Sequence, residues 1–281
     1  MSYRCFNVTI EDKVAHIVMS RPEKRNSMIP EFWDELPEII HDLDDNAKAR
    51  AIVISSTGPH FSSGLDVKAF VTGAPDADRQ AGIQRGADFY QMVLRMQRSF
   101  SVLEECRIPV LAAIQGGAIG GGVDLVTACD IRYATQDAFL TIFEINIGMT
   151  ADVGTFPRLV KLIPEGIVRE LAYTGRRMPA TEAKEVGLVN RVFPDQETML
   201  REVMGIARQI ASKAPLAVYG CKRMINYARD HSTADGLDYI GIWNASMLQL
   251  DEMREAITAN AENRAGNFAD LPRVKRRTSG E

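Results

Sequence analysis

Apolar and polar positions alternate along the first half of the chain in a way that predicts short strands joined by helices. Four stretches have the pattern of strands: FNVTI, VAHIVMS, AIVIS and IPVLAAIQ. The first two predict a hairpin, and the last two predict buried strands. Helical periodicity fills PEFWDELPEIIHDLDD, despite its internal proline, and the region around 79–106. This alternation of strands and helices predicts an α/β fold.

The second half of the chain is mostly helical. Gly187 ends the helical segment TEAKEV, because glycine readily adopts the left-handed conformation that closes a helix. Pro215 separates two further helices, since proline is tolerated at the start of a helix but not inside it. We therefore predict a core domain over residues 1–195 and a helical C-terminal region over residues 196–281 that serves oligomerisation.

A stripe of large apolar side chains marks the last helical pattern, which covers roughly 234–266. Its members recur at helical spacings: Trp243, Met247, Leu248, Met253 and Ile257. An apolar stripe of this kind is buried either in the core or against another subunit. Both alternatives stay open at this point.

The composition is that of a large globular domain. Of the 281 residues, 46% are hydrophobic and 25% are charged, which allows a sizeable core and excludes a disordered or collagen-like chain. The four cysteines include no CxxC pair and lie far from the histidines in the sequence, so we predict a reducing compartment and no metal site. Without an apolar run of membrane length or a signal sequence, the expectation is a cytoplasmic protein that does not enter the membrane.

One basic cluster, RVKRR at 273–277, is the feature that suggests a nucleic acid. The net charge of −4 argues against general nucleic-acid binding, so we interpret the cluster as a solvated tail and predict no nucleic-acid partner. A protein that only binds RNA through this cluster is kept as an alternative of a different class. Such a role gives no reason for acids in apolar surroundings.

Five glycines in the segment IQGGAIGGGVDL need an explanation, because glycine costs backbone entropy and adds nothing to packing. Their spacing fits neither the phosphate loop G-x-x-x-x-G-K-[ST] nor the dinucleotide fingerprint G-x-G-x-x-G. It fits a sharp turn into a helix that starts near Gly121, where free N–H groups can stabilise developing negative charge. The loop FSSGLDVKAF also joins a strand to a helix, so the Leu65 N–H can complete an oxyanion hole. Each loop alone is also consistent with an ordinary strand–helix turn.

Three acids stand in largely apolar stretches: Asp124 in GGGVDL, and Glu144 and Asp152 in FEINIGMTADVG. A carboxylate in such surroundings is costly unless it is paired or used in chemistry. Structural alternatives exist for each, since Asp124 can interact with the helix dipole and Glu144 can be a salt-bridged core acid. Asp152 can cap a helix that begins near Val153. Their occurrence together beside two candidate oxyanion loops favours a catalytic role.

These motifs resemble the crotonase (enoyl-CoA hydratase/isomerase) superfamily over nearly the whole chain. FSSGLD is similar to its first oxyanion segment, and IQGGAIGGGVDLVTACDIRYAT is similar to its second. Within the superfamily, SSGLD, GGGVDL, ACDIRYATQDAF and FEINIGMTADVGT are similar to the dienoyl-CoA isomerases. The resemblance implies a crotonase-like fold with a coiled ββα-repeat core and a helical C-terminal trimerisation region. It also implies a homotrimer or a dimer of trimers.

The resemblance further implies the site and its substrate. The oxyanion hole falls on Leu65 and Gly121, and the catalytic acids fall on Asp124, Glu144 and Asp152. The expected enzyme is an isomerase that converts 3,5-dienoyl-CoA to 2,4-dienoyl-CoA in fatty-acid β-oxidation. The acyl-CoA thioester is its substrate, and no separate cofactor is expected.

The physical chemistry of that reaction accounts for two acids. A thioester carbonyl held by two amides gains enolate character, which acidifies the proton on C2. Reprotonation at C6 then yields the conjugated product, and one carboxylate cannot easily serve both ends. We predict that Glu144 removes the C2 proton and that Asp152, in a poorly solvated place that raises its pKa, protonates C6. Asp124 then tunes or holds Glu144.

Departures from the family pattern leave a second activity open. Simple hydratases of the family carry glutamate at both positions that match 124 and 144, whereas this chain has the shorter Asp124 and the additional Asp152. An enoyl-CoA hydratase that adds water to 2-enoyl-CoA is therefore the alternative function. A lysine that often reaches the CoA phosphates is replaced here by Ala269, so the substrate-binding contacts are expected from three other residues: Arg25, Ser63 and Lys68.

Overall fold

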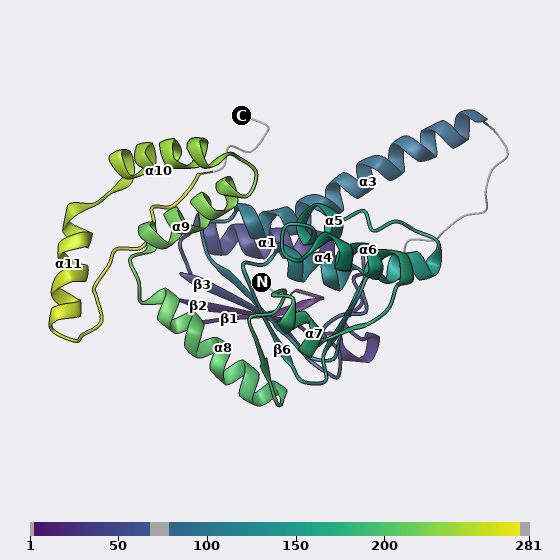
Figure 1. Cartoon of the computed structure of the whole chain (residues 1–281), viewed down its shortest axis with the longest axis horizontal. Helices are drawn as coiled ribbons and strands as arrows, with labels where there is room; N and C mark the ends of the chain where they lie inside the picture. Colours follow the sequence, from purple (N-terminus) through teal and green to yellow (C-terminus); the bar gives the residue numbers. More distant parts are fainter. Residues whose placement is uncertain (1–2, 68–78, 276–281) are drawn as a thin grey trace.

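The computed structural model describes residues 3–67 and 79–275, which form two β-sheets surrounded by helices (Figure 1). The larger sheet has the strands β1 (Phe6–Glu11), β2 (Val14–Met19), β3 (Ala51–Ser56), β4 (Val110–Ile114), β6 (Ile131–Thr135) and β9 (Arg191–Phe193), in that order. The smaller sheet has the order β5 (Gly117–Ile119), β7 (Phe139–Thr141) and β8 (Met178–Pro179). The predicted hairpin of β1 and β2 is confirmed, and every other pairing in the larger sheet is parallel.

The chain alternates between the two sheets as it winds. β4 in the larger sheet is followed by β5 in the smaller one and then by α4 (Gly121–Ala128). β6 and β7 repeat the alternation, so the predicted α/β fold with coiled β-β-α units is confirmed. The glycine-rich turn before α4 directly follows β5 of the smaller sheet.

Twelve helical segments complete the described part of the chain. Besides α4 they are η1 (Pro22–Lys24), α1 (Phe32–Asp45), α3 (Arg79–Glu105), η2 (Phe143–Ile147), α5 (Thr155–Leu159), α6 (Glu165–Thr174), α7 (Ala180–Glu185), α8 (Gln196–Ala211), α9 (Pro215–Ala228), α10 (Thr233–Met247) and α11 (Leu250–Ala261). The predicted closing role of Gly187 is confirmed by its φ of +86° after α7. None of the helices in the described ranges combines the length and the apolarity that crossing a bilayer requires.

Side chains of the larger sheet alternate between two apolar clusters, because successive residues of a strand point to opposite faces. On β3, Ile52 belongs to one cluster and Val53 to the other. α8 covers the Val53 face through apolar residues spaced by four along one side of the helix: Met199, Val203, Ala207 and Ala211. The predicted division of the chain at residue 195 stays a prediction, and α8, which follows it, packs on the sheet of the predicted core.

On the opposite side of the core, α1 packs against α3, and a proline inside α1 is accommodated by a bond between these helices. Pro37 has no N–H to donate to the carbonyl of Trp33, four residues earlier. The hydroxyl of Ser99, on α3, donates to that carbonyl at 2.6 Å. The buried carbonyl is therefore satisfied, and α1 and α3 are tied together.

The helices α10 and α11 extend away from the sheets at one side of the molecule (Figure 1). The prediction of one helical pattern over 234–266 was wrong, because the backbone is extended at Leu248 and Gln249, with ψ of 123° and 108°. No proline or glycine marks this break, so the sequence gives no local signal for it. Four residues of the apolar stripe are between 41% and 61% exposed: Met247, Leu248, Met253 and Ile257. The stripe is therefore not part of the core.

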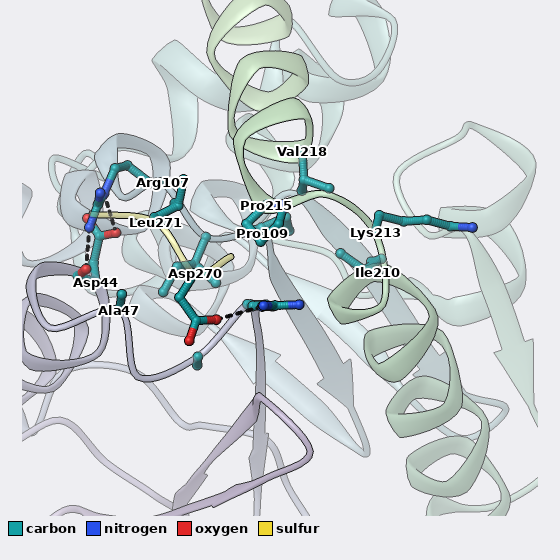
Figure 2. A pocket seen from close by; sticks show the side chains of 13 residues that line it. Asp44, Ala47, Arg107, Pro109, Ile210, Lys213, Pro215, Val218, Asp270 and Leu271 are labelled. Carbon is teal, nitrogen blue, oxygen red and sulfur yellow. Dashed lines mark hydrogen bonds and ion pairs between the residues drawn. The ribbon is translucent and has the colours of Figure 1, made fainter. Parts of the chain in front are cut away.

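The segment after α11 returns to the sheet and is held there by polar contacts. Asp270 accepts hydrogen bonds from Lys13 at 2.7 Å and from Arg50 at 2.8 Å. Figure 2 shows the pocket beneath this segment, which is lined on one side by Arg107 and on the other by Lys213 and encloses only about 10 Å³. A space of that size holds at most one water molecule, so it is a packing gap. Of the basic cluster 273–277, the last two residues lie outside the described ranges.

Candidate active site

The backbone amides of Leu65 and Gly121 lie close together, as the sequence predicts. A Cβ atom on Gly121 would be 3.7 Å from the Leu65 nitrogen, and a Cβ atom on Gly64 would be 3.0 Å from the Gly121 nitrogen. Neither amide donates a hydrogen bond to another described residue. Two neighbouring N–H groups without partners can both donate to one developing oxyanion.

Isolated parallel bridges connect the loop of Leu65 to its surroundings. Ser62 pairs with Ala118, and Met28 pairs with Leu65. In the second bridge, the Met28 N–H donates to the Gly64 carbonyl at 2.8 Å, and the Met28 carbonyl accepts from the Asp66 N–H at 3.0 Å. Because both bonds involve the neighbours of Leu65, the bridge fixes this loop while the Leu65 N–H stays without a partner.

The turn into α4 needs glycine for two separate reasons. Gly120 has φ of +52°, in the left-handed region, and a Cβ atom there would be 3.0 Å from Oε1 of Glu144. A Cβ atom on Gly121 would be 2.9 Å from the sulfur of Met28. The Glu144 carboxyl therefore lies against the turn that presents the Gly121 amide, and a side chain at either glycine would disturb the arrangement.

Asp124 lies in the first turn of α4 and is 1% exposed. Its Oδ1 accepts hydrogen bonds from the Thr155 N–H at 2.6 Å and from the Thr155 hydroxyl at 2.8 Å. Burial raises the pKa of Asp124 to about 6, although these two bonds and the charge of Arg158 lower it. An interaction with the dipole of α4 therefore does not by itself explain the place of Asp124, because its carboxyl is buried and accepts hydrogen bonds from Thr155 on another segment.

Glu144 follows β7 on η2, as predicted, and carries its carboxyl toward Asp124. Burial raises the pKa of Glu144 to about 7, and the negative charges of Asp124 and Asp152 add to the rise. Its Oε2 is buried and has no hydrogen-bond partner in the described ranges. Glu144 therefore forms no salt bridge with any described residue, in contrast to the alternative of a salt-bridged core acid. A half-buried acid with one buried oxygen that has no partner and a pKa near neutrality is suited to proton transfer.

Asp152 lies on the loop before α5 and is half-buried. The alternative role of helix cap is not seen, because α5 begins at Thr155 and its N-cap residue is Gly154. Burial raises the pKa of Asp152, which agrees in direction with the prediction from its apolar neighbours. Its charge raises the pKa of both Asp124 and Glu144, so the structure brings the three predicted acids into one electrostatic cluster.

The predicted substrate-binding residues fall partly beside the oxyanion loop. The Ser63 N–H donates to the Arg25 carbonyl at 2.9 Å, which joins the loop after η1 to the loop of Leu65. Arg25 is exposed and has φ of +52°, in the left-handed region. Lys68 lies outside the described residues.

Two residues of the site were not predicted from the sequence. Thr155 holds Asp124, and Arg158 lies close enough to lower the pKa of Asp124 while its Nε donates to Glu104 at 2.7 Å. The only local signal is their position a few residues after Asp152. No group of three His, Cys, Asp or Glu residues suited to hold a metal ion occurs in the described ranges, and the expectation of no metal stays a prediction.

Two unpaired backbone amides beside a cluster of three acids define an enzyme site for proton transfer next to a carbonyl. The sequence profile of the Enoyl-CoA hydratase/isomerase family matches residues 9–271. The chain therefore belongs to the enoyl-CoA hydratase/isomerase family.

Relatives with more specific names match over most of the chain. The human mitochondrial Delta(3,5)-Delta(2,4)-dienoyl-CoA isomerase is 45% identical over 269 residues, which cover 94% of this chain and 81% of that protein. The peroxisomal protein of the same name from Arabidopsis thaliana is 39% identical over 264 residues, which cover 93% of this chain and 94% of that protein. Among solved structures, an enoyl-CoA hydratase from Bacillus anthracis has a TM-score of 0.86 at 28% identity and covers 95% of this chain and 100% of that chain.

Proposed function

We propose that this protein is a Δ3,5-Δ2,4-dienoyl-CoA isomerase, which moves the two double bonds of a 3,5-dienoyl-CoA to give a 2,4-dienoyl-CoA. The observation that carries the proposal is the Glu144 carboxyl, which lies against the turn that presents the unpaired Gly121 amide, and the third acid, Asp152, stands on the loop before α5. Relatives of that name, at 39% and 45% identity over more than nine tenths of the chain, support it.

The reaction begins at the thioester. Its carbonyl oxygen accepts hydrogen bonds from the Leu65 and Gly121 amides, which stabilise the enolate that forms. Glu144 removes a proton from C2, and the electrons of that C–H bond form the new bond between C2 and C3. The electrons of the C3–C4 π bond form the bond between C4 and C5, and those of the C5–C6 π bond become a lone pair at C6, so that negative charge reaches C6.

Asp152 completes the reaction by donating a proton to C6. Three neighbouring carboxyl groups with raised pKa values favour a state in which the cluster holds a proton at neutral pH. The isomerisation requires the arrangement of this proton in which Asp152 is protonated and Glu144 is charged. Asp124, held by Thr155, is a positioning residue that raises the pKa of Glu144.

A spectrophotometric assay of the purified protein tests the function directly. We expect it to convert 3,5-dienoyl-CoA to the conjugated 2,4-dienoyl-CoA, with weaker or no hydration of 2-enoyl-CoA. Hydration without isomerisation would favour the alternative, an enoyl-CoA hydratase. That alternative is compatible with the scaffold, because a solved enoyl-CoA hydratase shares it, but it gives no role to Asp152.

We also propose that α10 and α11 mediate assembly into a homotrimer or a dimer of trimers. The support is the exposed apolar stripe on these helices, which is costly to leave in water. Arg25 and Ser63 are proposed to contact the CoA part of the substrate, since their loops adjoin the oxyanion loop.

The compartment is a separate proposal. Composition and the unpaired cysteines favour the cytoplasm, whereas the human and Arabidopsis relatives carry the words mitochondrial and peroxisomal in their names. Fractionation of cells that produce the tagged chain distinguishes the three compartments.

A further inference from the structure

The loop 149–154 separates two cavities of about 380 Å³ each. The first is mostly apolar and is lined by Ile142 and Ile145, close to the predicted base. The second is polar and is lined by Asp152. Ala151 lines both cavities, so this loop is a thin wall between them.

Apart from Asp152, the charged groups on the wall of the polar cavity pair with one another. Three ion pairs account for them: Arg158 with Glu104 at 2.7 Å, Arg229 with Glu104 at 2.9 Å, and Lys161 with Asp230. Asp152 has no cationic partner in the described ranges. A cavity of this size with polar walls holds water, so Asp152, which lines it, lies within reach of solvent.

The other two acids do not line this cavity. This difference in position matters for repeated turnover. Each reaction leaves Glu144 with a proton taken from C2 and leaves Asp152 without the proton that it gave to C6. A second reaction can start only after Glu144 has lost its proton and Asp152 has regained one.

We propose that the polar cavity is the route by which Asp152 takes its proton from solvent between turnovers; this inference rests on the proposed isomerase function. In that step a water molecule in the cavity donates a proton to the Asp152 carboxylate and receives one in turn from bulk water. Glu144 separately releases the proton that it took from C2, so no net proton is gained or lost over the cycle.

An isotope experiment on the unaltered enzyme tests the route. The substrate is a 3,5-dienoyl-CoA with deuterium at C2, and the reaction runs in ordinary water. The proposal predicts ordinary hydrogen at C6 of the product, because Asp152 is loaded from solvent. Deuterium found at C6 would mean that Glu144 passes its deuteron to Asp152 inside the site, and would overturn the proposal. No conversion at all would instead count against the proposed function.

A substitution in the cavity wall tests the same route by kinetics. Ser101, on α3, lines the polar cavity and is not one of the residues that react with the substrate. Ser101→Leu should therefore narrow the polar cavity, whereas Ser101→Ala should not. The first turnover uses a proton already on Asp152, whereas later turnovers need a new one. Ser101→Leu should therefore give a burst of about one product per site followed by a steady rate lowered roughly 10-fold, on the scale of an impaired proton transfer.

The matched control makes this experiment decisive. Ser101→Ala loses the same hydroxyl, which accepts a hydrogen bond from Arg158 at 3.2 Å, but leaves the cavity open. It should show no burst and a steady rate close to that of the unaltered enzyme. If both variants behave alike, or if Ser101→Leu slows the first turnover as much as the later ones, the cavity is not the route.

Discussion

Thr155 donates two hydrogen bonds to one oxygen of Asp124, from its N–H at 2.6 Å and from its hydroxyl at 2.8 Å. This places the start of α5 directly against the first turn of α4. The loop that carries Asp152 ends at the same point, so the contact between Thr155 and Asp124 helps to fix the positions of Asp124 and Asp152 relative to each other. The bonds favour the charged form of Asp124, but burial outweighs them.

Asp124 should therefore lower the stability of the folded protein at neutral pH. Folding raises the pKa of Asp124 from 3.8 to about 6, so the folded protein binds a proton at this group more tightly than the unfolded chain does. The stability that this proton gives the folded protein is fully present below pH 3.8 and is lost as the pH rises through about 6. Asp124→Asn keeps an oxygen for Thr155 and does not titrate. Relative to the unaltered protein, we expect the variant to gain about 3 kcal/mol in unfolding free energy as the pH rises from 3.8 to about 6.

Denaturant unfolding at several pH values measures this change. Thr155→Val is a useful comparison, because it removes the hydroxyl that bonds to Asp124 and leaves the acid in place. A constant difference between Asp124→Asn and the unaltered protein across the whole pH range would contradict the assigned burial cost.

Glu144→Gln should reduce the rate of isomerisation without abolishing substrate binding. The amide is nearly isosteric with the carboxyl but cannot accept the C2 proton, so kcat should fall by ~100-fold or more while acyl-CoA binding changes little. The measurement is kcat together with the exchange of the C2 proton in deuterated water. If the variant exchanged the C2 proton as fast as the unaltered enzyme does, the base would have to be another residue.

Asp152→Asn separates the isomerase from the hydratase. The variant cannot donate a carboxylic proton, so it should stay folded, bind acyl-CoA and lose most of its dienoyl isomerisation. A hydratase that works through Asp124 and Glu144 should barely respond to this change. Strong hydration of 2-enoyl-CoA that the substitution leaves unchanged, with no isomerisation by either protein, would defeat the assignment.

Gly121→Pro tests the oxyanion hole by removing the N–H itself. Proline is compatible with the first position of a helix, and we expect a loss of ~100-fold or more in kcat. Gly121→Ala is the control, because it keeps the N–H and adds only the Cβ that meets the Met28 sulfur at 2.9 Å. Leu65→Ala should be mild, since only its backbone is used. A folded and fully active Gly121→Pro protein would exclude the Gly121 amide from the reaction.

The apolar stripe on α10 and α11 should hold subunits together. Sedimentation at micromolar concentration is expected to show a trimer or a larger multiple of three. Replacing Met247 and Met253 by glutamate should shift the protein toward monomers, because two charges would be buried in an apolar contact. A stable monomer of the unaltered chain would refute the proposed interface.

Local patterns in the sequence determined most of the elements. The β1/β2 hairpin, α1 and the start of α4 at Gly121 all follow from periodicity or glycine placement, which depend on neighbours within a few residues. The break between α10 and α11 could not be predicted in this way, since residues 248–249 have ordinary helix-compatible side chains. The apolar neighbours of Asp152 also pointed to a raised pKa for that acid.

The tertiary structure decided which groups meet and how deeply each is buried. Asp124 finds its partner Thr155 31 residues away, and the Leu65 amide reaches Gly121 only through the bridges made by Met28 and Ser62. Sequence neighbours suggested that Asp152 is the poorly solvated acid, yet it is half-buried on a polar cavity, while Glu144 has a pKa of about 7. A pKa depends on the solvent and charge that surround a carboxyl in three dimensions, and residues adjacent in sequence supply only part of those surroundings.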